Sequence, residues 1–209
     1  MKNVLLLGDS IRVGYDKAVK KTLEGIAEVY FPAENCRFAA YTLRCLTEYK
    51  ALLNGERADV VHWNAGLWDC LRQYGEEPNT PIEIYGYYID RVCVRIKKLF
   101  PDAKVIFATS TSVLSEKMDP SFKRYNEEIE AYNAVAAEIA KKHGFEINDL
   151  YAASRSLPDE AHSDPVHYYT PMGTETFANQ VLRYLADALG LDETPEYKEV
   201  LHTDKPFGM

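Results

Sequence analysis

The stretch Val4-Leu5-Leu6-Leu7-Gly8-Asp9-Ser10 decides the fold of this chain. Its four consecutive apolar residues, Val4–Leu7, are typical of a short strand that is buried on both faces. A glycine turn then carries Asp9 and Ser10 to the start of a segment with helical spacing. A buried strand that leads through a tight turn into a helix is the first half of a βα unit, from which parallel sheets are built.

The same alternation continues along the rest of the chain. Further strands are predicted at Val29–Phe31, Val60–Trp63, Val105–Ala108 and Phe145–Ile147, and helices at residues 12–26, 41–53, 82–100, 121–143 and 172–189. The helix at 121–143 has the clearest pattern, because its apolar residues recur every three or four positions. Right-handed crossovers place helices on both faces of such a sheet. The sequence therefore predicts an α/β protein, a three-layer α/β/α sandwich around a five-stranded, mostly parallel sheet.

Length and charge limit the classes of partner. The chain has 209 residues, with 24 Lys and Arg against 32 Asp and Glu, for a net charge of −8. We expect one domain over residues 1–190 and a C-terminal extension over residues 191–209. Binding to nucleic acid or to an anionic membrane surface depends on clustered Lys and Arg. We therefore expect neither partner, and a homodimer is left open.

Motifs for cofactors and metals are absent from the sequence. It contains no GxGxxG, no Walker loop, no HExxH and no GxSxG. Its four cysteines, Cys36, Cys45, Cys70 and Cys93, are widely spaced and contain no CxxC pair, which favours reduced thiols. The start MKNVLLLGDS is too weakly apolar for a signal peptide or a membrane span. We expect a cytoplasmic protein with no cofactor and no metal.

Two loops that follow predicted strands carry chemistry-bearing residues. Ser10 stands at the start of a helix, where backbone N–H groups favour developing negative charge. A serine nucleophile needs a base, and the base needs an orienting group. Asp164-Pro165-Val166-His167 offers both, so Asp164 is predicted to orient His167 as the base for Ser10. Three other interpretations stay open: a simple helix cap at Asp9 or Ser10, a solvated loop, and a metal site made by His162, Asp164 and His167.

Four short blocks together resemble the SGNH, or GDSL-type, serine hydrolases. They are Gly8-Asp9-Ser10, Asn35–Thr42 with Ala40 at the position of the family's glycine, Gly66-Leu67-Trp68-Asp69, and Asp164-x-x-His167. The resemblance extends from about residue 3 to residue 190. It implies the flavodoxin-like SGNH hydrolase fold and serine-dependent hydrolysis of carboxylic esters by Ser10, His167 and Asp164.

The resemblance also implies a set of donors for the oxyanion. The family uses the N–H of the nucleophile, the N–H of the second-block glycine and the amide of a third-block asparagine. The first two correspond to the N–H groups of Ser10 and Ala40. Trp68 stands where the asparagine is expected, so either its indole N–H or the amide of Asn64 is the candidate replacement. Trp68 could equally be a wall of the pocket.

The substrate is less closely constrained by the sequence. Asp9, Arg37 and Tyr168 are candidate substrate-binding residues, and Arg12 is a second cation near the site. Tyr168 and Tyr169 adjoin His167, which makes both of them candidates for lining the site. No long apolar lid segment is present, which favours a small-molecule ester with a short acyl group such as acetyl. The alternative function is a non-catalytic module that binds a carbohydrate or an acyl ligand on the same scaffold.

Overall fold

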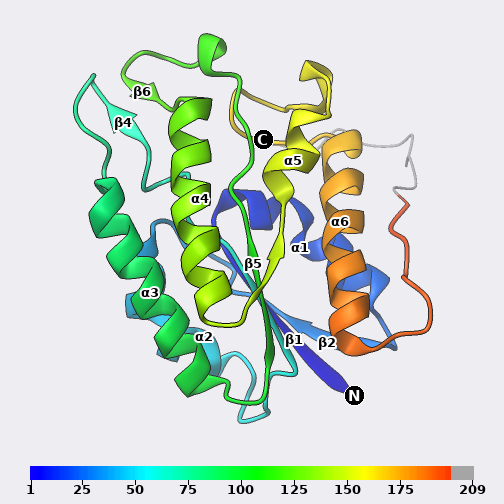
Figure 1. Cartoon of the computed structure of the whole chain (residues 1–209). Coiled ribbons are helices and arrows are strands. Elements are labelled where there is room, and N and C mark those ends of the chain that lie inside the picture. Colours follow the sequence, from blue (N-terminus) through cyan, green and yellow to red (C-terminus); the bar gives the residue numbers. More distant parts are fainter. Residues whose placement is uncertain (199–209) are drawn as a thin grey trace.

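The computed structural model describes residues 1–198, which form one parallel sheet between two layers of helices (Figure 1). The strands of the sheet are β1 (Lys2–Leu7), β2 (Ala27–Tyr30), β3 (Val60–Trp63), β5 (Lys104–Ala108) and β7 (Glu146–Asn148). Their order is β2-β1-β3-β5-β7, and every neighbouring pair is parallel. The predicted fold class is confirmed, and each predicted strand lies within two residues of its expected place.

Helices cover both faces of this sheet. They are α1 (Ser10–Thr22), α2 (Ala39–Ala51), α3 (Ile82–Leu99), α4 (Asn126–Lys142), α5 (Leu150–Arg155) and α6 (Pro171–Leu189). Helices α1 and α6 pack together on one side, whereas α3 packs between α2 and α4 on the other (Figure 1). Because both faces are covered, strands such as Val60–Trp63 are buried along their whole length, which explains their unbroken apolar runs.

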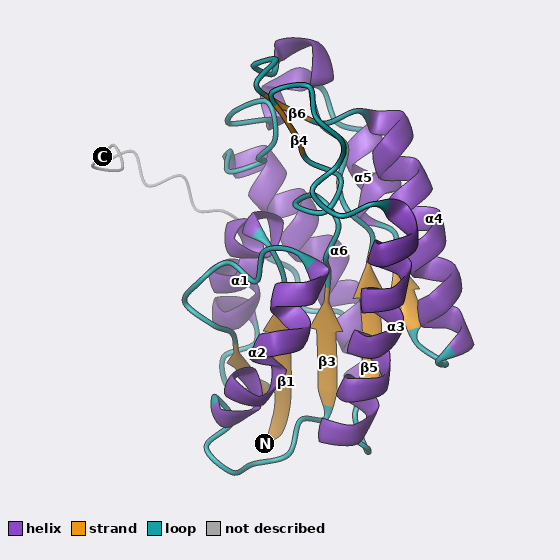
Figure 2. Cartoon of the chain, turned by 90° about the vertical axis from the view of Figure 1, so that its left-hand side faces the viewer, coloured by secondary structure: helices purple, strands orange, loops and turns teal. Residues whose placement is uncertain are grey.

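The start of the predicted helix at 121–143 is wrong. Helix α4 begins only at Asn126, and Phe122–Lys123 instead forms strand β6, which pairs antiparallel with β4 (Arg72–Gln73). The side chain of Asp119 accepts hydrogen bonds from Ser121, which holds a turn before the strand. Phe122 and Tyr125 are 38% and 39% exposed, so two aromatic residues outside the helix had extended its apolar pattern. The resulting ribbon lies beyond the carboxyl ends of the strands (Figure 2).

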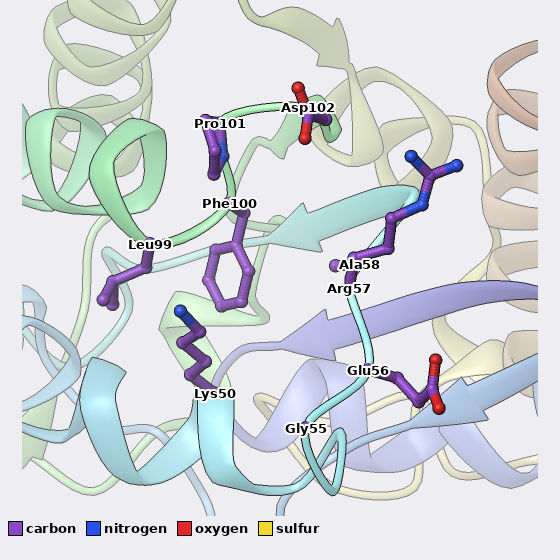
Figure 3. A pocket seen from close by; sticks show the side chains of 9 residues that line it. All are labelled: Lys50, Gly55, Glu56, Arg57, Ala58, Leu99, Phe100, Pro101 and Asp102. Carbon is purple, nitrogen blue, oxygen red and sulfur yellow. The ribbon is translucent and has the colours of Figure 1, made fainter.

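A hollow lies at the opposite, amino ends of the strands (Figure 3). Its lining includes Ala58, just before β3, and Asp102, just before β5. The remaining lining residues are Lys50, Gly55, Glu56, Arg57, Leu99, Phe100 and Pro101. None of the residues that the sequence singled out for chemistry lies in this hollow.

The last described residues return along α6. The side chain of Asn179 in that helix exchanges two hydrogen bonds with the backbone of Tyr197, at 2.7 and 2.9 Å. Residues 199–209 of the predicted extension lie outside the described part of the chain. Within residues 1–198, no helix is both long enough and apolar enough to span a bilayer.

Candidate active site

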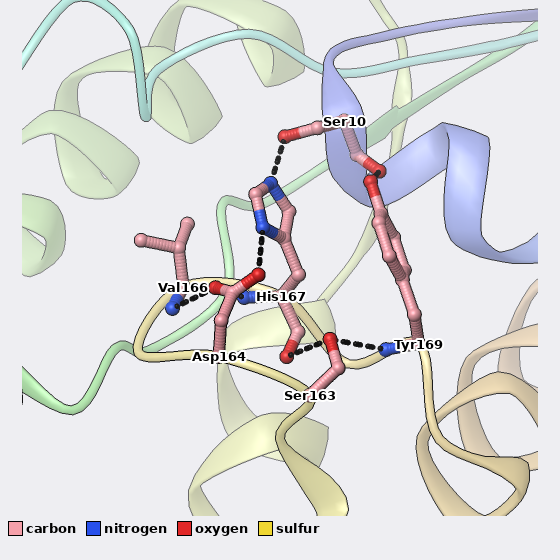
Figure 4. A network of polar contacts seen from close by, with 6 residues as sticks. All are labelled: Ser10, Ser163, Asp164, Val166, His167 and Tyr169. Carbon is pink, nitrogen blue, oxygen red and sulfur yellow. Dashed lines mark hydrogen bonds and ion pairs between the residues drawn. The ribbon is translucent and has the colours of Figure 1, made fainter. Parts of the chain in front are cut away.

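The structure brings together the three residues that the sequence predicted as a triad. Ser10 Oγ lies 2.8 Å from His167 Nε2, and His167 Nδ1 lies 2.7 Å from Asp164 Oδ2 (Figure 4). Ser10 opens α1 directly after β1, while Asp164 and His167 belong to the loop that precedes α6. Strand β1 has β2 on one side and β3 on the other, so Ser10 lies at the switch point of the sheet, where ligands of such folds bind.

Asp164 is held in place by its own turn. Its Oδ1 accepts hydrogen bonds from the N–H groups of Val166 and His167, at 2.8 and 2.9 Å. Partial burial acts to raise the pKa of Asp164, but these hydrogen bonds and the His167 ring outweigh it and leave the pKa below its usual value. The carboxylate is therefore ionised at neutral pH, and its Oδ2 accepts a hydrogen bond from the Nδ1–H group of His167.

Tyr169, a sequence candidate for lining the site because it adjoins His167, supports the imidazole from the side. Its hydroxyl donates to the carbonyl oxygen of Ser10 at 2.6 Å, and its ring stacks on His167 with centroids 4.8 Å apart. The neighbouring Tyr168, the predicted substrate residue, is instead buried against Phe177 with its hydroxyl 2.9 Å from Ser112 Oγ. That assignment is corrected: consecutive side chains in this extended segment point in opposite directions, so Tyr169 faces the site.

The turn that carries Ser10 depends on close packing. Asp9 is fully buried and caps α1 by accepting a hydrogen bond from the Ile11 N–H at 3.0 Å. Burial raises the pKa of Asp9, while the Asn64 amide and the Ile11 N–H oppose that shift. Its predicted substrate contact is therefore corrected to a helix cap. A Cβ at residue 8 would lie 1.9 Å from Asn64 Oδ1, so only glycine fits between β1 and the end of β3.

The two backbone N–H groups that the sequence predicted as oxyanion donors lie at the starts of helices. Ser10 is the first residue of α1 and Ala40 the second residue of α2, and N–H groups in a first turn have no acceptor within their own helix. The start of α2 is anchored by Asp69, whose carboxylate accepts the Ala39 N–H at 3.1 Å. Burial raises the pKa of Asp69 to about 7, against the effect of this hydrogen bond. Asp69 thereby sets the position of the Ala40 N–H.

The two candidates for the third donor occupy different places. Asn64 follows β3 and lies against Gly8, directly beside the nucleophile turn. Trp68 instead packs edge-on against Phe122 of the ribbon, with ring centroids 6.4 Å apart. Asn64 therefore packs against Gly8 of the nucleophile turn, whereas Trp68 packs against the ribbon.

The remaining predicted residues, Arg37, Arg12 and His162, contact side chains other than those of the triad. Arg37 is exposed with a positive φ of 52°, and its guanidinium lies 4.9 Å above the ring of Tyr41. Arg12 is buried and ion-paired with Asp16, so it does not face a substrate. The ring of His162 packs on Tyr168, 3.8 Å between centroids, and no group of three metal-ligating side chains occurs within residues 1–198.

Solved structures share this fold. A lipase/acylhydrolase from Enterococcus faecalis matches 96% of this chain and 100% of its own, with a TM-score of 0.71 and 20% identity. An acetyl xylan esterase matches 88% of this chain and 99% of its own, with a TM-score of 0.69 and 17% identity. A catalytic mutant of an acetylxylan esterase from Geobacillus stearothermophilus matches 95% of this chain and 97% of its own, with a TM-score of 0.67 and 16% identity. The resemblance to the SGNH hydrolase fold is thus confirmed.

Curated relatives match by sequence over part of their length. The PC-esterase domain-containing protein 1A of Mus musculus is 26% identical over 166 residues, and that of Homo sapiens is 25% identical over 166 residues. The match takes in 73% of this chain but only 36% of each relative. No family model matches the chain.

Proposed function

We propose that this protein is a serine-dependent hydrolase of carboxylic esters. The observation that carries the proposal is the continuous polar contact from Ser10 Oγ through His167 to Asp164, at 2.8 and 2.7 Å. This is the geometry that an activated nucleophile requires. Esterases and acylhydrolases among the structures of the same fold, and the PC-esterase domain in the name of the curated relatives, support it.

The reaction follows from the roles of the three side chains. His167 Nε2 takes the proton of Ser10 as its Oγ bonds to the ester carbonyl carbon, and the resulting imidazolium then protonates the departing alcohol. Water attacks the acyl-serine in the same way, releasing the acid and restoring Ser10. Asp164 keeps the Nδ1 proton in place and stabilises the imidazolium throughout.

The negative charge on the carbonyl oxygen needs donors that are already in position. The N–H groups of Ser10 and Ala40 provide two of them, at the positive ends of α1 and α2. We assign the third to the side-chain amide of Asn64, because it is the polar side chain packed against the nucleophile turn.

The substrate is proposed to be a small ester with a short acyl group. Two of the structures that share the fold are acetyl xylan esterases, so an acetyl group is the leading candidate. Rates that rise along a series of p-nitrophenyl esters from acetyl to decanoyl would contradict this choice.

Hydrolysis of p-nitrophenyl acetate by the Ser10→Ala variant tests the nucleophile. Loss of a triad serine lowers kcat by roughly 10³-fold or more. Ser156→Ala, a change of an exposed serine at the end of α5, is the matched control and should keep the wild-type rate. A fluorophosphonate probe should label wild type at Ser10 and leave Ser10→Ala unlabelled. A wild type with neither hydrolysis nor labelling would be a binding module instead.

A further inference from the structure

Arg124 is a buried cation that forms no ion pair in the part of the chain that the structure describes, although its guanidinium lies 5.2 Å from the centroid of the Phe122 ring. It follows strand β6 and is 3% exposed, yet its one hydrogen bond runs from Nε to the carbonyl oxygen of Leu67. Its Nη1 is buried without any partner, and no carboxylate within residues 1–198 forms an ion pair with it. A guanidinium carries five N–H donors, so most of its capacity is unused.

The other fully buried arginine shows what a structural role requires in this protein. Arg12 forms an ion pair with Asp16, and its guanidinium also donates to the carbonyl oxygens of Pro32 and Glu34. Asp16 is the counter-ion of Arg12, and the two carbonyl oxygens accept further N–H groups, so that only Nε of Arg12 is buried without a partner. Arg124 lacks such a counter-ion, and a buried charge without one destabilises a fold until an anion reaches it.

Arg124 is attached to the loop after β3, the loop whose Asp69 also anchors the start of α2. Leu67, which accepts its hydrogen bond, lies in the loop after β3, between Asn64 and Trp68. Burial lowers the pKa of Arg124, while the charges of Cys70, Asp9 and Asp164 act to raise it. Those last two carboxyls flank Ser10 and His167 from separate loops. Asp164 is engaged with His167, and Asp9 caps α1 through Oδ1, while its buried Oδ2 has no hydrogen-bond partner and forms no ion pair with Arg124 within residues 1–198.

We propose that Arg124 is a specificity residue that binds a carboxylate on the alcohol part of the ester substrate. The proposal rests on the hydrolase function above, with its short acyl group, which leaves the alcohol part to carry the charge. The guanidinium fork pairs with a carboxylate through two parallel hydrogen bonds, and such charge-assisted bonds are strongest where water is excluded. The substrate class is therefore acetyl-type esters of hydroxy acids. The attraction between Arg124 and the substrate carboxylate then exceeds the repulsion of that carboxylate by the net charge of −8 on the chain.

Two esters that differ only in charge test the proposal. They are 4-acetoxybenzoate, which carries a carboxylate, and 4-acetoxybenzamide, which is neutral and of the same shape. Wild type should favour the anionic ester in kcat/KM by about 10- to 100-fold, the range expected for a hydrogen-bonded charge pair. Arg124→Gln, which keeps a donor for Leu67, should lose that preference through KM, while its kcat/KM on the neutral ester stays within about threefold.

Arg72→Gln is the matched control from the same ribbon. Arg72 is bound by Glu128 at 2.7 to 3.2 Å, so its charge is already neutralised. The control should keep the wild-type preference for the anionic ester. Equal losses of kcat/KM on both esters in Arg124→Gln, or a wild type without any preference, would overturn the proposal. Arg124 would then only hold the loop after β3 in place through its hydrogen bond to Leu67.

A measurement on wild type alone covers the case in which Arg124→Gln does not fold. Hydrolysis of p-nitrophenyl acetate should be inhibited at least 10-fold more strongly by 4-hydroxybenzoate than by 4-hydroxybenzamide. Equal inhibition would refute carboxylate recognition while leaving the hydrolase intact. Wild type that hydrolyses none of the three esters would refute the hydrolase, and this proposal with it.

Discussion

The carboxyl and amino ends of the sheet bury different kinds of side chain. At the carboxyl ends the chain buries polar groups such as Asp9, Asn64 and Asp69, and at the amino ends it buries the ring of Phe100 beside an open hollow (Figure 3). The starts of α1, α2 and α6 all face the carboxyl ends, where their N–H groups and positive dipole ends stabilise buried negative charge. The residues proposed to act in catalysis therefore lie at one end of the sheet, and we expect changes at the other end to affect mainly stability.

Phe100→Ala gives the largest expected effect on stability and should separate the two ends. Removing a buried aromatic ring costs about 3–5 kcal/mol of unfolding free energy. Chemical denaturation measures the loss, and p-nitrophenyl acetate hydrolysis by the remaining folded protein should stay at the wild-type rate. Phe122→Ala is the counterpart at the carboxyl ends, and because that ring is partly exposed it should lose less stability. A larger loss for Phe122→Ala would reverse the comparison.

Asn64→Ala, in contrast to Phe100→Ala, should lower catalytic activity. Loss of one oxyanion donor lowers kcat by about 10²- to 10³-fold, or about 2.7–4 kcal/mol in the barrier, with a much smaller change in KM. Steady-state kinetics on p-nitrophenyl acetate measure both constants. Trp68→Phe, which removes the indole N–H but keeps a ring against Phe122, is the comparison. If the larger loss of kcat occurs in Trp68→Phe, the donor role passes from Asn64 to Trp68.

Asp69→Asn should change how the stability of the protein depends on pH, because Asp69 is a buried carboxyl at the carboxyl ends of the strands. Burial raises the pKa of Asp69 from 3.8 to about 7, so between these values the folded state holds a proton that the unfolded state releases. Wild type should therefore lose stability relative to Asp69→Asn as pH rises from about 4 to about 7, by at most about 1.4 kcal/mol per pH unit. Above pH 8 the difference should level off. Urea unfolding of both proteins at several pH values checks this, and a constant difference would contradict the buried titration.

Much of the fold could be read from local patterns. The apolar run Val4–Leu7 and its counterparts predicted the five strands, because a strand covered on both faces must be apolar throughout. The prediction failed at 121–125, where exposed Phe122 and Tyr125 happened to continue the spacing of α4. Pairing between β4 and β6 decided that segment, and a pair of two-residue strands leaves almost no pattern in a sequence.

Some residues of the candidate site could likewise be predicted from local patterns, and others could not. Ser10, Asp164 and His167 could be named from their motifs, because a tight turn and an i,i+3 spacing are local features. Tyr169 was a candidate only through its place beside His167, and its stacking on that ring could not be predicted, because it depends on which way the side chain points. Arg124 could not be named at all, because its place depends on which loop the ribbon covers.

The sequence by itself determined the order of strands and helices and the residues of the nucleophile and base loops. Burial and turn formation select residue types over a few neighbouring positions, so they are visible in the chain. Three features came only from the three-dimensional structure: Asn64 lies against Gly8, Tyr169 rather than Tyr168 stacks on His167, and Arg124 is buried with no ion pair to any residue of 1–198. The first and the last join segments that the parallel sheet brings together at its carboxyl ends, which no spacing along the chain records. The stacking of Tyr169 is local, but it depends on the direction of the side chain rather than on the residue type.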